Sequence, residues 1–231
     1  MEVLQKEKID WNLIEYIWDE GKGGKMRIII DGTVGAGKTT LITGMSQRDI
    51  QKKKYPGISD LGYPVFTDMM ASVIRTMRAD GISDPAQDWP LFFEIAVNRC
   101  VSDYNRAEKN QINFYDRGIY FLEVMAERYN QKLPERYYEF CETNRYDNPV
   151  FIFEPILSID MTKPHEMDNK QKVYTVEQRM QQHYQIMKIY EEKGYNVIII
   201  PLKSEDPYEN NIYRLNLIKK KLGLFEENEN V

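Results

Sequence analysis

Residues 32–39 have the composition and spacing of a loop that binds phosphate. They read GTVGAGKT and match the pattern G-x-x-x-x-G-K-[ST]. Glycines let backbone amides approach phosphate oxygens closely, and successive amides then point at one anion. Lys38 can bridge the β- and γ-phosphates of a nucleoside triphosphate, and the Thr39 hydroxyl can contact Mg²⁺. The residues predicted to hold the nucleotide are Gly32, Thr33, Val34, Gly35, Ala36, Gly37, Lys38, Thr39 and Thr40.

Two details of this loop depend on the helix that follows it. Thr40 either contacts the α-phosphate or simply lies in the helix, and the sequence leaves both possibilities open. The positive amino end of a helix over residues 38–53 is expected to add to the attraction for phosphate. We expect Lys38 to be partly exposed at this loop–helix junction, so that its replacement leaves the fold intact.

An acidic and a basic residue follow the apolar run Ile112–Tyr115. Ligands of a parallel sheet bind at the carboxyl ends of its strands, and Asp116 and Arg117 fall at such an end. A carboxylate there can hold Mg²⁺, directly or through water, or accept a proton. A guanidinium there can clamp a phosphate. The alternative is that Asp116 caps the next turn and Arg117 forms a surface ion pair; the phosphate loop favours the functional interpretation.

A third candidate, Asp68, follows the apolar run Tyr63–Thr67. Its carboxylate could face the same crevice and take the proton of an attacking hydroxyl. Asp is also a frequent helix N-cap, and residues 69–80 have a helical pattern. The sequence leaves base and cap equally open.

Short apolar runs alternate with helical patterns along the chain, which predicts a doubly wound α/β domain. Continuous apolar runs are typical of strands buried on both faces of a parallel sheet. The predicted strands are Met26–Ile30, Tyr63–Thr67, Ile112–Tyr115, Pro149–Phe153 and Asn196–Ile200. The predicted helices cover about 38–53, 68–80, 91–109, 175–193 and 206–223.

The sequence predicts three segments along the chain. Residues 1–24 form an amino-terminal helix and a glycine-rich joint, 25–225 the α/β domain, and 226–231 a frayed tail. Trp11 and Trp18 of the first helix pack on the main domain or form a homodimer contact. Within the domain, residues about 155–172 are polar and long enough for a lid, although an ordinary surface loop is the alternative.

The helix predicted after residue 90 contains Phe92, Phe93 and Arg99. Its aromatic side chains could stack on a planar base, and Arg99 could meet a phosphate. Aromatic residues contribute so much to buried cores that plain core packing is the more frequent outcome.

Composition excludes several classes of protein. The chain has 231 residues, a net charge of −5 and a pI of about 5.3, which weighs against a protein that coats nucleic acid. The two cysteines, Cys100 and Cys141, fit neither a metal site nor a disulfide framework and favour a reducing compartment. No signal peptide or membrane-spanning run is recognisable. We expect a cytoplasmic protein with no membrane partner.

The motif set also resembles a known family. The segment IIIDGTVGAGKTTL resembles the phosphate loop of deoxynucleoside and thymidylate kinases. Together with FYDRG, VFIFEP and GYNVIIIP, it resembles the P-loop kinase-like family AAA_28, which includes ribosylnicotinamide-kinase-type domains. The resemblance covers about residues 26–202. It implies a three-layer α/β/α P-loop NTPase fold with about five parallel strands, ATP with Mg²⁺ on Thr39 and Asp116, and transfer of the γ-phosphoryl group to a nucleoside or nucleotide.

The sequence departs from this pattern in the lid and beside two motifs. Relatives often carry Glu where Asp68 stands and an acidic residue where Phe121 stands. The lid reads DNKQK at 168–172, without arginine, so Lys170, Lys172 or Arg179 must cover the transferred phosphoryl group.

We therefore predict a kinase in which Lys38, Asp68, Asp116 and Arg117 act on ATP and a small acceptor. No guanine-reading N-K-x-D stretch follows a late strand, although the choice between ATP and GTP stays open. One alternative is an ATPase or switch that acts on a protein partner. Another is a kinase of nucleic-acid ends or bases, against which the acidic pI weighs.

Overall fold

The computed structural model describes residues 24–45, 54–67, 69–158, 174–204 and 206–224. Within these ranges, five strands form one parallel sheet in the order β2-β3-β1-β4-β5. The strands are β1 (Met26–Gly32), β2 (Val65–Phe66), β3 (Ile112–Asp116), β4 (Val150–Phe153) and β5 (Val197–Ile200). The expected five-stranded α/β architecture is confirmed.

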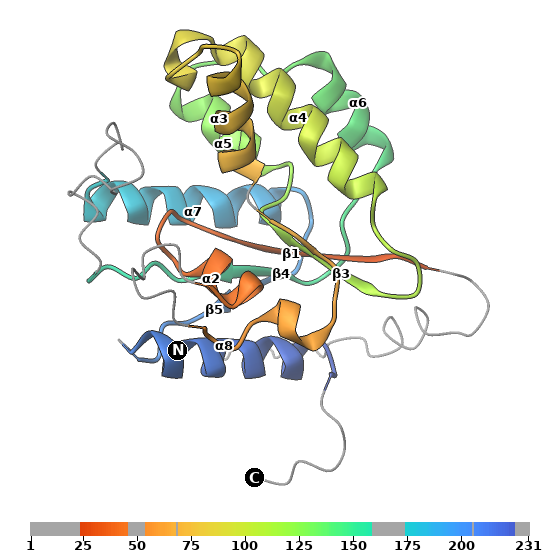
Figure 1. Cartoon of the computed structure of the whole chain (residues 1–231), viewed down its shortest axis with the longest axis vertical. Helices are drawn as coiled ribbons and strands as arrows, with labels where there is room; N and C mark the ends of the chain where they lie inside the picture. Colours follow the sequence, from red (N-terminus) through yellow and green to blue (C-terminus); the bar gives the residue numbers. More distant parts are fainter. Residues whose placement is uncertain (1–23, 46–53, 68, 159–173, 205, 225–231) are drawn as a thin grey trace, which may run out of the picture.

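Helices cover both faces of the sheet and complete three layers (Figure 1). Successive strand residues point to opposite faces, so Ile29 packs in one core while Ile28 and Ile30 pack in the other. The first face carries α3 (Met69–Ala79), α4 (Trp89–Asn105), α5 (Phe121–Arg128), α6 (Glu135–Thr143) and α7 (Val176–Glu192). The second carries α2 (Lys38–Thr43), α8 (Pro207–Lys221) and the 3₁₀ turn Ile58–Leu61. A second 3₁₀ turn, Pro85–Gln87, precedes α4.

The helix predicted over residues 38–53 is the clearest error of the sequence analysis. Helix α2 ends at Thr43 because Gly44 takes a left-handed conformation with φ 68° and closes the last turn. Met45 then pairs with Lys54 in an isolated antiparallel bridge. The helix that follows the phosphate loop has only six residues, so it adds less of a dipole than expected.

Other boundaries differ by a few residues. Helix α4 begins at Trp89 because Asp88 caps it, accepting a hydrogen bond from the Leu91 amide at 3.0 Å. The Thr175 side chain caps α7 in a capping box with Gln178, as predicted. Helices α5 and α6 lie in a stretch where no element is predicted from the sequence.

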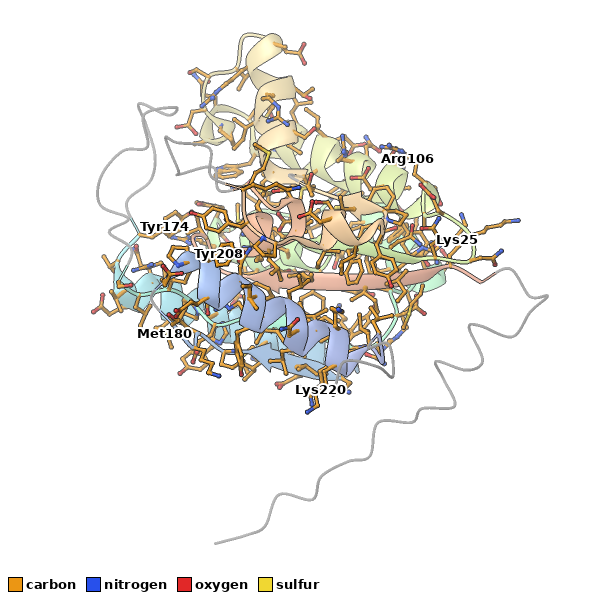
Figure 2. All side chains as sticks on the ribbon, turned by 60° about the horizontal axis from the view of Figure 1, so that its bottom comes forward. Lys25, Arg106, Tyr174, Met180, Tyr208 and Lys220 are labelled. Carbon is orange, nitrogen blue, oxygen red and sulfur yellow. The ribbon has the colours of Figure 1, made fainter. Side chains whose placement is uncertain are left out.

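The amino and carboxyl ends of the parallel strands lie on opposite sides of the molecule. Lys25 stands before β1 at the amino end of the strands, whereas Tyr174 stands before α7 at their carboxyl end, and the two lie at opposite sides of the molecule (Figure 2). The predicted site residues that the structure describes, in the phosphate loop and at Asp116 and Arg117, lie at the carboxyl end. The predicted amino-terminal helix, most of the lid and the tail after residue 225 lie outside the described residues. In the described part of the chain, no helix has the length and apolarity needed to cross a membrane.

Candidate functional site

The predicted phosphate loop runs from the end of β1 to the start of α2. Lys38 is buried, with 5 % of its surface exposed, and its Nζ donates to the Thr33 carbonyl oxygen at 2.8 Å. The expectation of a partly exposed Lys38 is therefore wrong, because its side chain turns back onto its own loop and lies among Asp31, Asp116 and Arg117. Burial lowers the pKa of Lys38 to about 7; Arg117 lowers it further, while Asp116 and Asp31 raise it.

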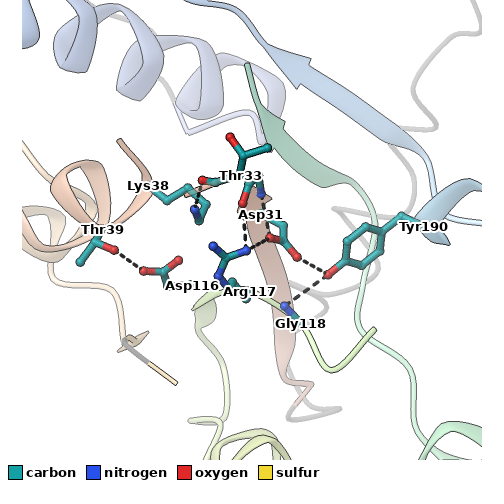
Figure 3. A network of polar contacts seen from close by, with 9 residues as sticks. Asp31, Thr33, Lys38, Thr39, Asp116, Arg117, Gly118 and Tyr190 are labelled. Carbon is teal, nitrogen blue, oxygen red and sulfur yellow. Dashed lines mark hydrogen bonds and ion pairs between the residues drawn. The ribbon is translucent and has the colours of Figure 1, made fainter. Parts of the chain in front are cut away.

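The loop meets the end of β3 through one short hydrogen bond. The Thr39 hydroxyl donates to Asp116 Oδ2 at 2.6 Å, so the two residues predicted as Mg²⁺ ligands lie in contact (Figure 3). Thr40 lies in α2, and its carbonyl accepts from the side chain of Asn211 at 3.4 Å.

A hydroxyl and a carboxylate are the hard oxygen donors that Mg²⁺ prefers. Within the ranges that the structure describes, no group of three or more His, Cys, Asp or Glu side chains could hold a metal ion. Thr39 and Asp116 thus fit a magnesium ion that takes its remaining ligands from phosphate oxygens and water, the usual arrangement for this ion.

Arg117 faces the strand beside it, not open solvent. Its NH1 donates to Asp31 Oδ1 at 2.9 Å and to the Gly32 carbonyl oxygen at 2.9 Å, and its guanidinium lies 3.9 Å from the centre of the Phe121 ring. Its backbone has φ 80°, a conformation that costs a non-glycine residue free energy. These contacts hold the first loop residue, and the predicted clamp of Arg117 on a phosphate or acceptor stays a prediction.

Asp31 was not predicted as a site residue, yet it organises this network. It is fully buried, and burial raises the pKa of its carboxyl group while Arg117 and Lys38 oppose the rise. Oδ1 also accepts from the Gly32 amide at 2.7 Å, and Oδ2 accepts from the Tyr190 hydroxyl at 2.9 Å (Figure 3). Helix α7 is thereby joined to the start of the phosphate loop.

Gly118 completes the network from the β3 side. Its amide donates to the Tyr190 hydroxyl at 3.2 Å. A Cβ atom at this position would lie 2.4 Å from Ile29 Cδ1 and 2.7 Å from that hydroxyl, so a larger residue would force the buried Ile29 and Tyr190 side chains to move. The glycine of the FYDRG segment was a sequence signal for this close approach.

Tyr190→Phe is expected to lower the free energy of unfolding by about 1–3 kcal/mol, the usual cost of leaving buried polar groups unpaired. The change removes the hydroxyl that donates to Asp31 and leaves the Gly118 amide without its acceptor. Urea unfolding measures the effect. Tyr184→Phe on the same helix is the matched control, because Tyr184 has 61 % of its surface exposed. Equal stability of the two variants would contradict the account.

Several other predicted residues have clear positions. Arg99 Nε donates to Asp103 Oδ2 at 2.7 Å within α4, and its suggested contact with a phosphate stays a prediction. Phe92 and Phe93 are fully buried core residues. Arg179 is buried and donates to the carbonyl oxygens of Ile156 and Leu157 at 2.9 and 3.1 Å, which anchors the segment after β4. Asp68, Lys170 and Lys172 lie outside the described residues, so their predicted roles stay predictions.

Four buried side-chain atoms of the described residues have no hydrogen-bond partner. One is the hydroxyl of Thr33 in the phosphate loop. The other three share one turn of α7: Arg179 Nε, Gln182 Oε1 and His183 Nδ1. Buried polar atoms are normally paired, so these four are candidates for contacts with a bound ligand.

A cavity of about 520 Å³ lies apart from the loop, between α5, α6 and the carboxyl end of α7. No residue of the phosphate loop lines it; the lining residues include Tyr120, Tyr137, Cys141, Arg145 and Lys193. The Lys193 ammonium is paired with Glu123 at 2.7 Å. We assign neither nucleotide nor acceptor to this cavity, because its two cations are already engaged: Lys193 pairs with Glu123, and Arg145 donates to the carbonyl oxygens of Lys193 and Gly194.

Comparison with known proteins agrees with the loop and the sheet. The family model AAA_28, described as an AAA domain, matches residues 27–207. A Bacillus cereus protein named ribosome biogenesis GTPase A is 26 % identical over 136 residues, which are 58 % of this chain and 42 % of that protein.

Two solved structures of NadR share the fold. The complex with NR has a TM-score of 0.54 and 18 % identity, covering 90 % of this chain and 54 % of that one. The complex with NAD and AMP-PNP has a TM-score of 0.52 and 18 % identity, covering 88 % and 51 %. The chain therefore spans about half the length of these structures and less than half of the GTPase.

Proposed function

This chain belongs to the AAA_28 family, and we propose that it is an ATP-dependent phosphotransferase that acts on a small acceptor. The γ-phosphoryl group of ATP passes to a hydroxyl or phosphate of a nucleoside or nucleotide. The observation that carries this proposal is the contact of 2.6 Å between Thr39 and Asp116, which brings the phosphate loop and the end of β3 together.

Each residue has a role that its position supports. The backbone amides of residues 32–39 and the Lys38 ammonium bind the phosphates. Thr39 and Asp116 hold Mg²⁺, which supplies charge neutralisation on the phosphates when bound. Asp116 or Asp68 takes the proton of the acceptor late, because a loose transition state requires mainly positioning and charge stabilisation. Arg117, held by Asp31, positions Gly32, and a contact of its guanidinium with the acceptor stays part of the proposal.

The similar structures favour the nucleoside class of acceptor. One NadR structure was solved with NR and the other with NAD and AMP-PNP, an analogue of ATP. A nucleoside-type acceptor and ATP are therefore the first compounds to test. The lid segment, if it closes over the phosphates, excludes water and suppresses hydrolysis.

The test is a panel of acceptors with Mg²⁺ and either ATP or GTP. Nucleosides, nucleotides and nicotinamide riboside are each incubated with the full chain, and mass spectrometry detects the phosphorylated product. We expect one acceptor class to gain a phosphoryl group and to stimulate release of ADP. Normal triphosphate binding with no phosphorylated acceptor in the whole panel would refute the phosphotransferase.

The match to a GTPase favours a second candidate, a nucleotide hydrolase or switch that acts on a protein partner. It predicts hydrolysis without any acceptor and a partner retained in only one nucleotide state. Turnover of ATP or GTP in the absence of any acceptor separates it from the first proposal. The sequence itself has no N-K-x-D stretch after a late strand.

A further inference from the structure

A buried arginine on α8 holds three main-chain carbonyl groups at the carboxyl end of the sheet. Arg214 has 1 % of its surface exposed. Its NH1 donates to the Ala36 oxygen at 2.6 Å, its NH2 to the Glu154 oxygen at 3.0 Å and its Nε to the Pro201 oxygen at 3.1 Å. The guanidinium also lies 4.6 Å from the centre of the Phe153 ring. A planar group with fixed donors suits this geometry better than a lysine ammonium.

The three carbonyls belong to three different parts of the site. Ala36 lies in the phosphate loop after β1, Glu154 follows β4, and Pro201 follows β5; these three strands are neighbours in the sheet. Burial lowers the pKa of Arg214 to about 10, so the guanidinium is still charged at neutral pH. Burying a charge is unfavourable unless it is well hydrogen-bonded. The three carbonyl bonds meet this condition and fix the charge beside the phosphate loop.

The bond to Ala36 fixes the orientation of one peptide of the loop. In a trans peptide, the carbonyl and the following N–H point in opposite directions. The Ala36 carbonyl points to Arg214, so the Gly37 amide points to the other side, away from α8. Gly37 immediately precedes Lys38, which binds the Thr33 carbonyl across the loop.

The charge of Arg214 also acts at the site. It contributes to lowering the pKa of Lys38, so its potential is felt where the phosphates are expected. A second residue of α8 braces the same region, since Asn211 Nδ2 donates to the Thr40 oxygen at 3.4 Å and the Pro56 oxygen at 3.0 Å. Helix α8 thus supports both the loop and the start of α2.

We propose that Arg214 is a positioning residue for the phosphates: it turns the Gly37 amide toward the bound anion and adds a fixed positive charge behind the loop. This inference rests on the phosphate-binding part of the proposed function. It assigns to α8 a role in nucleotide affinity, although no atom of α8 needs to touch the nucleotide.

The experiment measures binding of inorganic tripolyphosphate to the full chain by calorimetry, in wild type, Arg214→Gln and Arg214→Lys. We expect Arg214→Gln to weaken binding about 10- to 100-fold, as for a lost charged hydrogen bond. Arg214→Lys keeps the charge without the fork, so an intermediate loss is expected. The ¹H–¹⁵N resonance of Gly37 should shift on binding in the wild type and less in both variants.

Arg27→Gln is the matched control, because Arg27 also donates to two carbonyls, those of Tyr104 and Lys25, from the other end of β1. It should leave tripolyphosphate affinity unchanged. Wild-type affinity and an unchanged Gly37 shift in both Arg214 variants would overturn the proposal, as would an equal loss in Arg27→Gln. If Arg214→Gln fails to fold, Arg214→Lys decides by the same two readouts. Tripolyphosphate binding without phosphorylation of any acceptor would refute the phosphotransferase and leave this inference standing.

Discussion

Lys38→Met is expected to lower the rate of phosphoryl transfer by about 10²- to 10³-fold, the usual loss when one preorganised donor to the transition state is removed. Methionine matches the length of the lysine stem but carries no charge. The ammonium is held 2.8 Å from the Thr33 oxygen of the same loop, so its position is fixed before a phosphate binds. Steady-state kinetics with the best acceptor of the panel measures the effect.

The control for Lys38→Met is Lys188→Met on α7, which removes an exposed ammonium paired with Glu192. That variant should keep its activity. Undiminished transfer by Lys38→Met would remove the lysine from the phosphate site and contradict the assignment of the loop.

The fold should tolerate the loss of Lys38. The sequence predicted this because Lys38 was expected to be partly exposed, whereas the structure predicts it because a buried lysine with a lowered pKa contributes little stability near pH 7. The pKa of Lys38 is about 7 in the folded chain and 10.5 ordinarily, so between these values the unfolded state binds the additional proton. Stability contributed through this group therefore rises with pH from about 7 upward. The difference in unfolding free energy between wild type and Lys38→Met should increase in favour of wild type from pH 7 to pH 9. A pH-independent difference would contradict the buried, depressed lysine.

Asp116→Asn is expected to lower turnover by about 10²- to 10⁴-fold, the range for loss of a general base, with loss of a metal ligand acting in the same direction. Asparagine keeps an oxygen that can accept from Thr39 but has no negative charge. Turnover measured against Mg²⁺ concentration separates the two roles: rescue at high Mg²⁺ indicates a ligand, and no rescue indicates a base.

Thr39 provides the matched pair for this experiment. Thr39→Ser keeps the hydroxyl that contacts Asp116 and should retain activity, whereas Thr39→Val should lose it. Full activity of Asp116→Asn at every Mg²⁺ concentration would show that the contact at the end of β3 has no part in the reaction.

The phosphate loop and the strands were predictable because their signals are local. The spacing of Gly32, Gly37 and Lys38 specifies a cradle without knowledge of the rest of the chain. Continuous apolar runs identify strands buried on both faces, and the five predicted strands all recur within a few residues. The sequence also contained Gly44, which ends α2, but a single glycine inside a helical pattern does not by itself decide where the helix stops.

The residues that surround the loop could not be predicted in the same way. Tyr190 is 159 residues from Asp31 along the chain, and Arg214 binds a carbonyl 178 residues away. Such contacts depend on strand order and helix placement, which periodicity leaves open. For the same reason the burial of Lys38 and the pairing of Arg117 with Asp31 emerged only from the folded chain.

Calorimetric titration of the full chain with AMP-PNP and Mg²⁺, at two temperatures, tests most directly whether the loop binds a nucleoside triphosphate. The account predicts saturable binding at one site in the wild type and binding weakened at least about 10-fold in Lys38→Met, with Lys188→Met unchanged. Two results would contradict the account. One is the absence of binding heat at both temperatures with both AMP-PNP and its guanine counterpart GMP-PNP. The other is equal affinity in wild type and Lys38→Met.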